Sequence, residues 1–229
     1  MDKVSSRSPA IVIVAKFPVA GCVKTRLCPP LAPHEAAALY TCFLQDTAAK
    51  VASLSAAEAY IALDTVAFTR ELQVLVDAME LPDSVCLIDQ GEGDLGARLS
   101  HILMNALPDP ERVVFIGADS PSLPLSYLEG AVSSLARHDV VIGPSDDGGY
   151  YLIGVSGHHL CLFNDIAWST SVVFEQTLAR ASAAGLKVDL LPGWFDVDDY
   201  AGLCRLRREL QENPSAAPRT ASYLADHSR

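Results

Sequence analysis

The stretch Ala10–Ala15, which reads AIVIVA, decides the fold class. Six consecutive apolar or small residues, with no polar residue alternating between them, predict a strand that is buried on both faces, as parallel sheets require. The stretch is far shorter than the roughly 20 residues of a membrane-spanning helix. It is followed at once by Lys16 and a loop containing Gly21. We therefore expect an inner strand of a covered sheet, with a polar loop at its carboxyl end.

The same alternation of short apolar runs and longer helical patterns continues along the chain. It predicts further strands at 60–63, 85–88, 113–117, 140–142, 150–155 and 188–191. It predicts helices at 33–51, 68–79, 97–107, 125–136, 171–184 and 200–211. Strands that alternate with helices in this way indicate an α/β domain of three layers, α/β/α, with a mostly parallel sheet. Since no linker divides the pattern, we expect one domain over 1–211. The mostly polar tail at 212–229 could dock a final turn through Tyr223 and Leu224.

Composition narrows the classes of partner. The 229 residues carry a net charge of -11, and such a surface repels both nucleic acid and anionic lipid. Any phosphate-binding function must then rest on a local cluster of cations or a bridging metal. Lys3 and Arg7 precede the first apolar run without a small-residue cleavage site, so a signal peptide is not expected. Six scattered cysteines are typical of free thiols in a cytoplasmic protein.

Cations gather in the loop that follows the first strand. In an α/β sheet the ligand lies beyond the carboxyl ends of the strands, and this loop holds Lys16, Lys24 and Arg26. Gly21 permits close backbone approach and Thr25 adds a hydroxyl donor, so the set suits a di- or triphosphate. We favour that interpretation over a solvated loop with incidental charges. The loop lacks the glycine spacing of a Walker A motif.

Carboxylates follow two later strands. Asp119 comes directly after the apolar run 113–116 and could bind a divalent cation or cap the next helix. Asp196 and Asp198 stand two residues apart and would face the same side of a strand, as two ligands of one metal do. Asp199 is better explained as the cap of the helix after it. These residues predict a metal site without fixing its ligands.

Three other motifs have competing interpretations. Asp147 stands in the glycine-rich stretch 143–151, which is either a tight hairpin or a ligand-facing loop. The stretch 91–96 matches G-x-G-x-x-G, but it follows the third strand and carries two carboxylates, so we expect it to border a base or ribose rather than a dinucleotide pyrophosphate. Trp168-Ser169-Thr170 precedes a helix, where a hydroxyl could cap the helix or contact a ligand. No histidine or serine motif of a hydrolase is present.

Taken together, six stretches carry a resemblance: AKFPVAGCVKTRL, GDLGARL, IGADSPSLP, GPSDDGGYYLIG, WST and DVDD. The sequence resembles the DUF2064 family of GT-A-type nucleotide-diphospho-sugar transferases, also described as radical-SAM/selenodomain-associated transferase 1. It is distantly similar to the phospholactate and molybdenum-cofactor guanylyltransferases. The resemblance covers about Ile11 to Leu210.

The resemblance implies a GT-A fold, a bound Mg²⁺ or Mn²⁺ and a residue set at each subsite. Lys24, Arg26 and Asp119 would be catalytic, and Asp119, Asp196 and Asp198 would hold the metal. The nucleotide would meet Lys16, Gly21, Lys24, Thr25, Arg26, Gly93, Asp94, Leu95, Gly96 and Arg98. The acceptor pocket would be lined by Asp147, Gly148, Gly149 and Tyr150. Two departures stand out: Ala20 replaces a family proline, and Asp199 replaces a threonine, which leaves open which of three acids touches the metal.

The resemblance implies a metal-dependent transferase that uses a nucleotide-linked donor and a small-molecule acceptor. The first expectation, as the family label implies, is a glycosyltransferase that uses a nucleotide-sugar donor. A nucleoside triphosphate donor would make it a nucleotidyltransferase that releases pyrophosphate, and three cations in the first loop suit a triphosphate. A nucleotide-binding module without chemistry is the third possibility. The base, the acceptor and the oligomeric state stay open.

Overall fold

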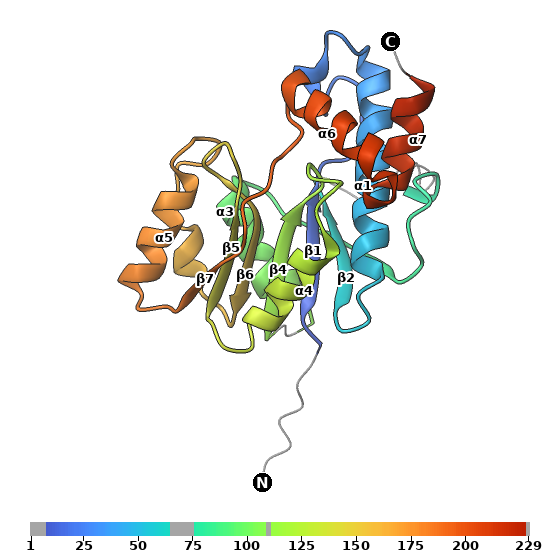
Figure 1. Cartoon of the computed structure of the whole chain (residues 1–229). Coiled ribbons are helices and arrows are strands. Elements are labelled where there is room, and N and C mark those ends of the chain that lie inside the picture. Colours follow the sequence, from blue (N-terminus) through green and yellow to red (C-terminus); the bar gives the residue numbers. More distant parts are fainter. Residues whose placement is uncertain (1–7, 65–75, 109–110, 228–229) are drawn as a thin grey trace.

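A seven-stranded sheet forms the middle layer of the molecule (Figure 1). The structure, a computed structural model, describes residues 8–64, 76–108 and 111–227. The strand order is β3-β2-β1-β4-β6-β5-β7. Among the described strands, β6 runs antiparallel to β4 and β5, and the other neighbouring pairs are parallel. The strands are β1 Ala10–Ala15, β2 Glu58–Leu63, β3 Val85–Asp89, β4 Arg112–Gly117, β5 Val140–Pro144, β6 Tyr150–Ser156 and β7 Val188–Leu190.

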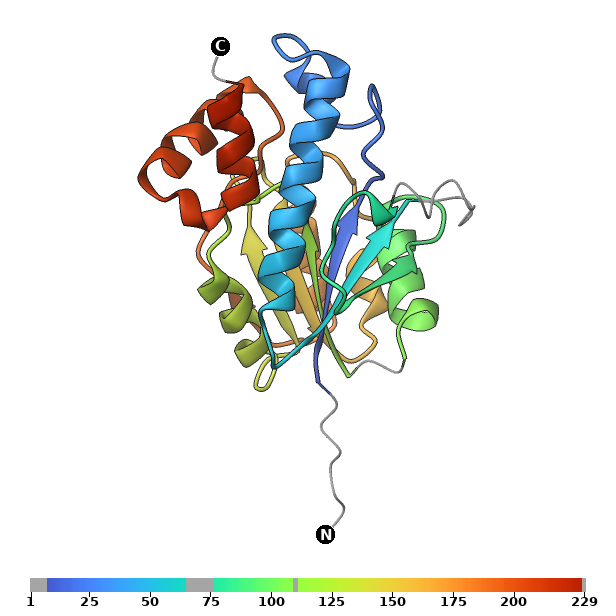
Figure 2. The same cartoon turned by 90° about the vertical axis from the view of Figure 1, so that its right-hand side faces the viewer.

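Helices cover both faces of this sheet, as Figures 1 and 2 show from two sides. One face carries α1 Pro33–Ala52, α4 Leu125–Ser134, α6 Tyr200–Glu212 and α7 Pro218–Asp226. The other face carries α3 Leu95–His101, its continuation Ile102–Ala106, the 3-10 turn Leu160–Phe163 and α5 Val173–Ala183. In β1, Ile11 and Ile13 are buried toward the first face and Ala10 and Val12 toward the second. Burial of β1 on both faces therefore explains its unbroken apolar run, as predicted. The three-layer α/β fold is confirmed.

Element boundaries follow local side-chain chemistry. The helix α3 begins two residues before its predicted start because the carboxylate of Asp94 accepts the Ala97 N–H at 2.9 Å and caps it. The helix α5 begins at Val173 rather than at residue 171. The predicted helix over 68–79 falls largely on residues outside the described ranges. Across the described residues, no helix combines the length and the apolar character needed to cross a membrane.

The C-terminal segment is packed rather than loose. After α6 the chain forms a 3-10 turn, Pro214–Ala216, and then α7, which lies against α1. The carboxylate of Asp46, on α1 and only 4% exposed, accepts the backbone N–H groups of Arg219 at 3.0 Å and Thr220 at 2.8 Å. Leu224 is buried in the same contact. A buried carboxylate thus holds the first turn of the last helix.

Candidate active site

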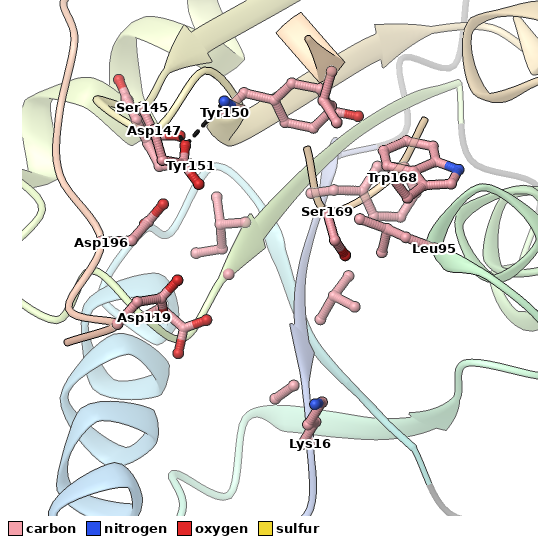
Figure 3. Close-up of a pocket in the computed structure, with 18 of the residues that line it drawn as sticks. Lys16, Leu95, Asp119, Ser145, Asp147, Tyr150, Tyr151, Trp168, Ser169 and Asp196 are labelled. Carbon is pink, nitrogen blue, oxygen red and sulfur yellow. Dashed lines mark hydrogen bonds between the residues drawn. The ribbon is translucent and has the colours of Figure 1, made fainter. Parts of the chain in front are cut away.

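A cavity of about 800 Å³ opens at the carboxyl ends of β1, β3 and β4 (Figure 3). Segments that lie far apart in the sequence line it, and the β5–β6 hairpin loop is one of them. Because β6 runs antiparallel between β4 and β5, that loop reaches the same edge of the sheet. The lining includes Lys16, Lys24, Thr25, Arg26, Gln90, Leu95, Arg98, Asp119, Ser145, Asp147, Gly149, Tyr150, Trp168, Ser169, Asp196 and Asp198.

Backbone hydrogen bonds join the acid-bearing segments of this lining. The Val197 N–H donates to the carbonyl of Asp119 at 2.9 Å, and the Trp194 N–H donates to the carbonyl of Pro144 at 3.1 Å. The hydroxyl of Ser120 also bonds the carbonyl oxygen of Phe195 at 2.9 Å. These bonds bring four carboxylates to the lining of the cavity: Asp119, Asp147, Asp196 and Asp198. Figure 3 shows the first three on one side of it.

The ammonium group of Lys24 lies between two of these carboxylates. Its Nζ is 2.5 Å from Asp119 Oδ1 and 3.0 Å from Asp198 Oδ1. The Lys24 side chain is 5% exposed, and the Tyr40 and Phe43 ring centroids lie 5.9 and 6.0 Å from Nζ. Burial alone lowers the pKa of this ammonium, but the two carboxylates outweigh burial and the pKa is raised. Lys24 is therefore charged at neutral pH.

Asp196 is the most buried carboxylate of the four. Burial raises its pKa to about 6. The Ser120 hydroxyl, 2.5 Å away, lowers that pKa, and the negative charges of Asp119, Asp198 and Asp147 raise it. The cluster thus carries more negative charge than Lys24 balances, which is an environment that attracts a further cation.

The ligand set fits a metal that arrives with phosphate. Within the described ranges, no group of three His, Cys, Asp or Glu side chains is arranged to hold a metal ion by itself. Mg²⁺ is usually held by one or two carboxylates together with substrate phosphates and water. Asp119 and Asp198 face the cavity with 41% and 49% of their side chains exposed. The assignment of Asp119, Asp196 and Asp198 to one metal stays a prediction.

The alternative roles of two acids are decided by the helix caps. The helix α4 has Pro124 as its N-cap, so Asp119 does not cap it. Asp199 caps α6, where its Oδ1 accepts the Gly202 N–H at 2.9 Å. The capping prediction for Asp199 is confirmed, and Asp119 is left free for ligand chemistry.

The loop after β1 brings its cations to the cavity on a fixed backbone. Lys16, Thr25 and Arg26 line the cavity beside Lys24. The Lys16 N–H donates to the Tyr40 hydroxyl at 3.1 Å. The next amide, that of Phe17, donates to Asp64 Oδ1 at 2.7 Å. These anchors lie on α1 and after β2, so the sequence around the loop gives no sign of them.

Gln90 is a residue that the sequence reasoning missed. It is 2% exposed and joins the first loop to the β3–α3 loop. Its Nε2 donates to the carbonyl of Ala15 at 3.0 Å, and its Oε1 accepts from Arg98 at 3.3 Å. The guanidinium of Arg98 also donates to the carbonyl of Gly93 at 2.9 Å. The available signal was its position, because a polar residue directly after a buried strand of such a sheet faces the ligand edge.

The β5–β6 loop is both a hairpin turn and a cavity wall. Asp147 Oδ1 accepts the Gly149 N–H at 2.9 Å and the Ser145 hydroxyl. Gly148 has φ +88°, and a Cβ there would lie 2.2 Å from the carbonyl oxygen of Ser171. Glycine is required because the two backbones touch. The two interpretations of this stretch are therefore compatible.

An apolar wall faces the carboxylates across the cavity. Leu95 and Trp168 form it, and Ser169 lies beside them (Figure 3). Trp168 also packs on Gly96, where a Cβ would lie 2.8 Å from the indole Nε1. The helix α5 has Val172 as N-cap without a side-chain cap bond, so the hydroxyls before it do not cap it.

Among the described residues, the lining leaves out five predicted ones: Gly21, Gly93, Asp94, Gly96 and Gly148.

Comparisons with known proteins identify the family of the chain. Residues 47–170, more than half of the chain, match the family described as uncharacterized proteins conserved in bacteria, DUF2064. The chain belongs to the DUF2064 family. This DUF2064 protein is similar to a protein of Desulfovibrio desulfuricans G20 that carries a provisional assignment as a nucleotide-diphospho-sugar transferase. The two share 32% identity with a TM-score of 0.86, over 96% of this chain and 95% of the other.

A second relative is the 2-phospho-L-lactate guanylyltransferase of Methanothermobacter thermautotrophicus strain Delta H. It is 30% identical over 140 residues, which are 61% of this chain and 58% of that protein. The 4-diphosphocytidyl-2C-methyl-D-erythritol synthase of Anaerococcus prevotii DSM 20548 shares the fold at 8% identity and a TM-score of 0.58, over 90% of this chain and 100% of that one. The first two relatives are named as transferases, and the third shows the shared fold alone.

Proposed function

We propose that the protein is a metal-dependent nucleotidyltransferase, which joins the nucleoside monophosphate part of a nucleoside triphosphate to a small phosphorylated acceptor. One observation carries this proposal: the cations of the first loop and the four carboxylates line the same cavity. Lys16 and Arg26 offer donors to phosphate oxygens, and Asp119 and Asp198 offer oxygens to a divalent cation. The guanylyltransferase relative supports a triphosphate donor.

The residues have distinct tasks in the proposed step. An oxygen of the acceptor phosphate attacks the α-phosphorus, the bond from that phosphorus to the bridging oxygen breaks, and pyrophosphate leaves with the electron pair. Arg26, exposed at the cavity, would neutralise the charge that develops on the leaving group, as positioned cations do in phosphoryl transfer. Asp119 and Asp198 would hold Mg²⁺ or Mn²⁺, which would supply positive charge to the donor phosphates when bound. Asp147, Gly149 and Tyr150 would border the acceptor.

Transfer of a glycosyl group from a nucleotide-sugar is the second candidate. The provisional assignment of the D. desulfuricans protein favours it. The same cations and carboxylates would then hold a diphosphate, and the apolar wall of Leu95 and Trp168 would lie against the sugar or the acceptor. Either donor is an intracellular metabolite, which together with six free cysteines supports a cytoplasmic enzyme.

A melting-temperature panel tests the proposal. It compares four nucleoside triphosphates and common nucleotide-sugars, each with and without Mg²⁺. A ligand at 100 times its Kd adds about 2.7 kcal/mol to the stability of the folded state, which is roughly 5–10 °C in a domain of this size. We expect the largest metal-dependent shift with one triphosphate. A larger shift with a nucleotide-sugar would favour glycosyl transfer instead. Melting shifts of equal size with and without Mg²⁺ would favour a nucleotide-binding module without chemistry.

A further inference from the structure

The resting position of Lys24 is unusual for a residue expected to contact phosphate. Its ammonium does not extend into the cavity; it is buried between Asp119 and Asp198 at 2.5 and 3.0 Å. Both carboxylates are about half exposed, whereas the Lys24 side chain is 5% exposed. The cation therefore approaches the pair from the protein side, and the carboxylates present their open side to the cavity.

The protein builds this placement in two ways. Lys24 has φ 48° and ψ 37°, a left-handed conformation that a non-glycine residue adopts only when its surroundings hold it there. The rings of Tyr40 and Phe43, both on α1, lie within about 6 Å of Nζ. The helix α1, the loop after β1, the end of β4 and the segment before α6 thus keep one positive charge at one point. An incidental surface ion pair needs no such support.

The charge balance has a consequence for metal binding. A divalent cation that enters alone would share Asp119 and Asp198 with a cation already bonded to both, and the two positive charges repel each other. A cation that enters bound to donor phosphates is part of a complex whose phosphate oxygens are negatively charged. Those oxygens attract Lys24 as well. The carboxylate pair is therefore ready for a metal–phosphate complex and poorly disposed to a bare metal.

We propose that Lys24 is a tethered cation that holds Asp119 and Asp198 in place and makes tight metal binding conditional on the donor. This inference rests on the proposed function, because it assumes that these carboxylates meet a metal. In it, Lys24 is a positioning residue of the resting enzyme. When the metal–donor complex binds, the ammonium shifts its bonds from the carboxylates to phosphate oxygens.

The test measures Mn²⁺ binding to the nucleotide-free protein by electron paramagnetic resonance, with no turnover involved. Lys24→Met should bind Mn²⁺ at least about tenfold more tightly than the wild type. Lys16→Met removes an equal charge from the same loop without touching the carboxylates, and it should stay within about threefold of the wild type. Lys24→Arg keeps the cation and should also stay near the wild type. Equal or weaker Mn²⁺ binding by Lys24→Met would overturn the proposal.

The wild type gives an independent result if Lys24→Met does not fold. Mn²⁺ alone should then shift the melting temperature by less than about 1 °C, whereas Mn²⁺ with the best nucleotide of the panel gives a shift of several degrees. An equal shift from Mn²⁺ alone would overturn the conditional-binding proposal. If instead no nucleotide binds in any arm while Lys24→Met still gains Mn²⁺ affinity, the donor assignment fails and the role of Lys24 stands.

Discussion

Asp119 is the residue whose replacement tests the proposed metal chemistry most directly. It lies beyond β4, caps no helix and faces the cavity with 41% of its side chain exposed. We expect Asp119→Asn to weaken the metal-dependent part of donor binding at least about tenfold, which is about 1.4 kcal/mol. The measurement is the donor-induced melting shift with and without Mg²⁺.

A matched control is available in Asp165. This acid is exposed, pairs with Arg180 and does not line the cavity among the described residues. Its backbone has φ 52°, which asparagine also tolerates. Asp165→Asn should retain the full metal-dependent shift. A similar loss in both variants would mean that charge, rather than the position of Asp119, is responsible.

Lys50 gives the protein a pH dependence that does not involve the cavity. On α1, its ammonium donates to the carbonyls of Pro121 at 2.8 Å and Leu123 at 2.5 Å, and burial lowers its pKa from 10.5 to about 8. Below pH 8 the folded and unfolded chains both hold this proton, and the burial penalty is fully present. Between pH 8 and 10.5 only the unfolded chain holds it, so Lys50 makes the free energy of unfolding rise with pH.

The comparison with Lys50→Met isolates this contribution. Urea unfolding at pH 7 and pH 9.5 should show wild-type stability gaining on the variant at the higher pH. Other titrating groups act on both proteins and cancel in the difference. A stability difference that is flat or falls between these pH values would show that Lys50 keeps an ordinary pKa.

The position of a site residue was predictable from the sequence where the residue follows the end of a strand. Lys16 and Asp119 follow buried strands directly, so the position of each was predictable. The contacts of Lys24 with Asp119 and Asp198 span up to 174 residues and depend on the tertiary fold. The contact of Tyr40 with Lys24 was equally unpredictable, since the sequence around Tyr40 indicates only an amphipathic helix.

At the scale of elements, the β5–β6 loop depends on Gly148. Gly148→Ala must adopt φ +88° and also places a methyl group against the backbone of Ser171. The left-handed conformation costs an alanine about 1–2 kcal/mol, and the clash adds about 1–3 kcal/mol. Gly185 has φ +68° with nothing within 4 Å of its Cβ position, so Gly185→Ala is the control for the first cost alone.

Urea unfolding of both glycine variants gives the difference. We expect Gly148→Ala to be less stable than Gly185→Ala by about 1–3 kcal/mol, and to lose transfer to the acceptor because Asp147 is displaced. Equal destabilisation would show that the loop can move away from Ser171 at no cost.

The helix α7 is a second element-scale test, since we infer that it belongs to the same folded unit as the sheet. Asp46→Ala removes a buried acceptor from two backbone N–H groups at the first turn of α7. Charge-assisted hydrogen bonds of this kind contribute about 1.5–3 kcal/mol. We expect Asp46→Ala to lower the free energy of unfolding by this amount and to accelerate amide hydrogen exchange in residues 218–226.

Asp226→Ala is the control, because Asp226 is exposed at the end of the same helix. Replacing it should change the free energy of unfolding by less than about 0.5 kcal/mol. If Asp46→Ala leaves exchange in α7 unchanged, the helix is held by its apolar contacts instead.

Elements with a strong apolar pattern were predictable, and those held by distant partners were not. The run at Ala10–Ala15 matches β1 residue for residue because a doubly covered strand needs an unbroken apolar stretch. The segment after Glu212 is mostly polar, and the first turn of its helix donates hydrogen bonds to Asp46, more than 170 residues earlier. No local pattern carries that information.

For the whole molecule, the strand alternation predicted the α/β class but not the strand order. Only the order shows that the β5–β6 loop comes to the edge where β1 and β4 end. That placement puts cations and carboxylates in one cavity of a chain whose net charge is -11. A phosphate ligand in so acidic a protein requires this local concentration of cations.

The central claim is that the chain transfers a nucleotidyl group with the help of a metal, and the released product reports it most directly. The protein is incubated with each nucleoside triphosphate or nucleotide-sugar, Mg²⁺ and a pool of small phosphorylated metabolites. Pyrophosphate and nucleoside diphosphate are then measured separately. We predict release of pyrophosphate that needs one triphosphate, the metabolite pool and Mg²⁺, and that is lost in Asp119→Asn. Release of nucleoside diphosphate from a nucleotide-sugar, with no pyrophosphate from any triphosphate, would contradict the account.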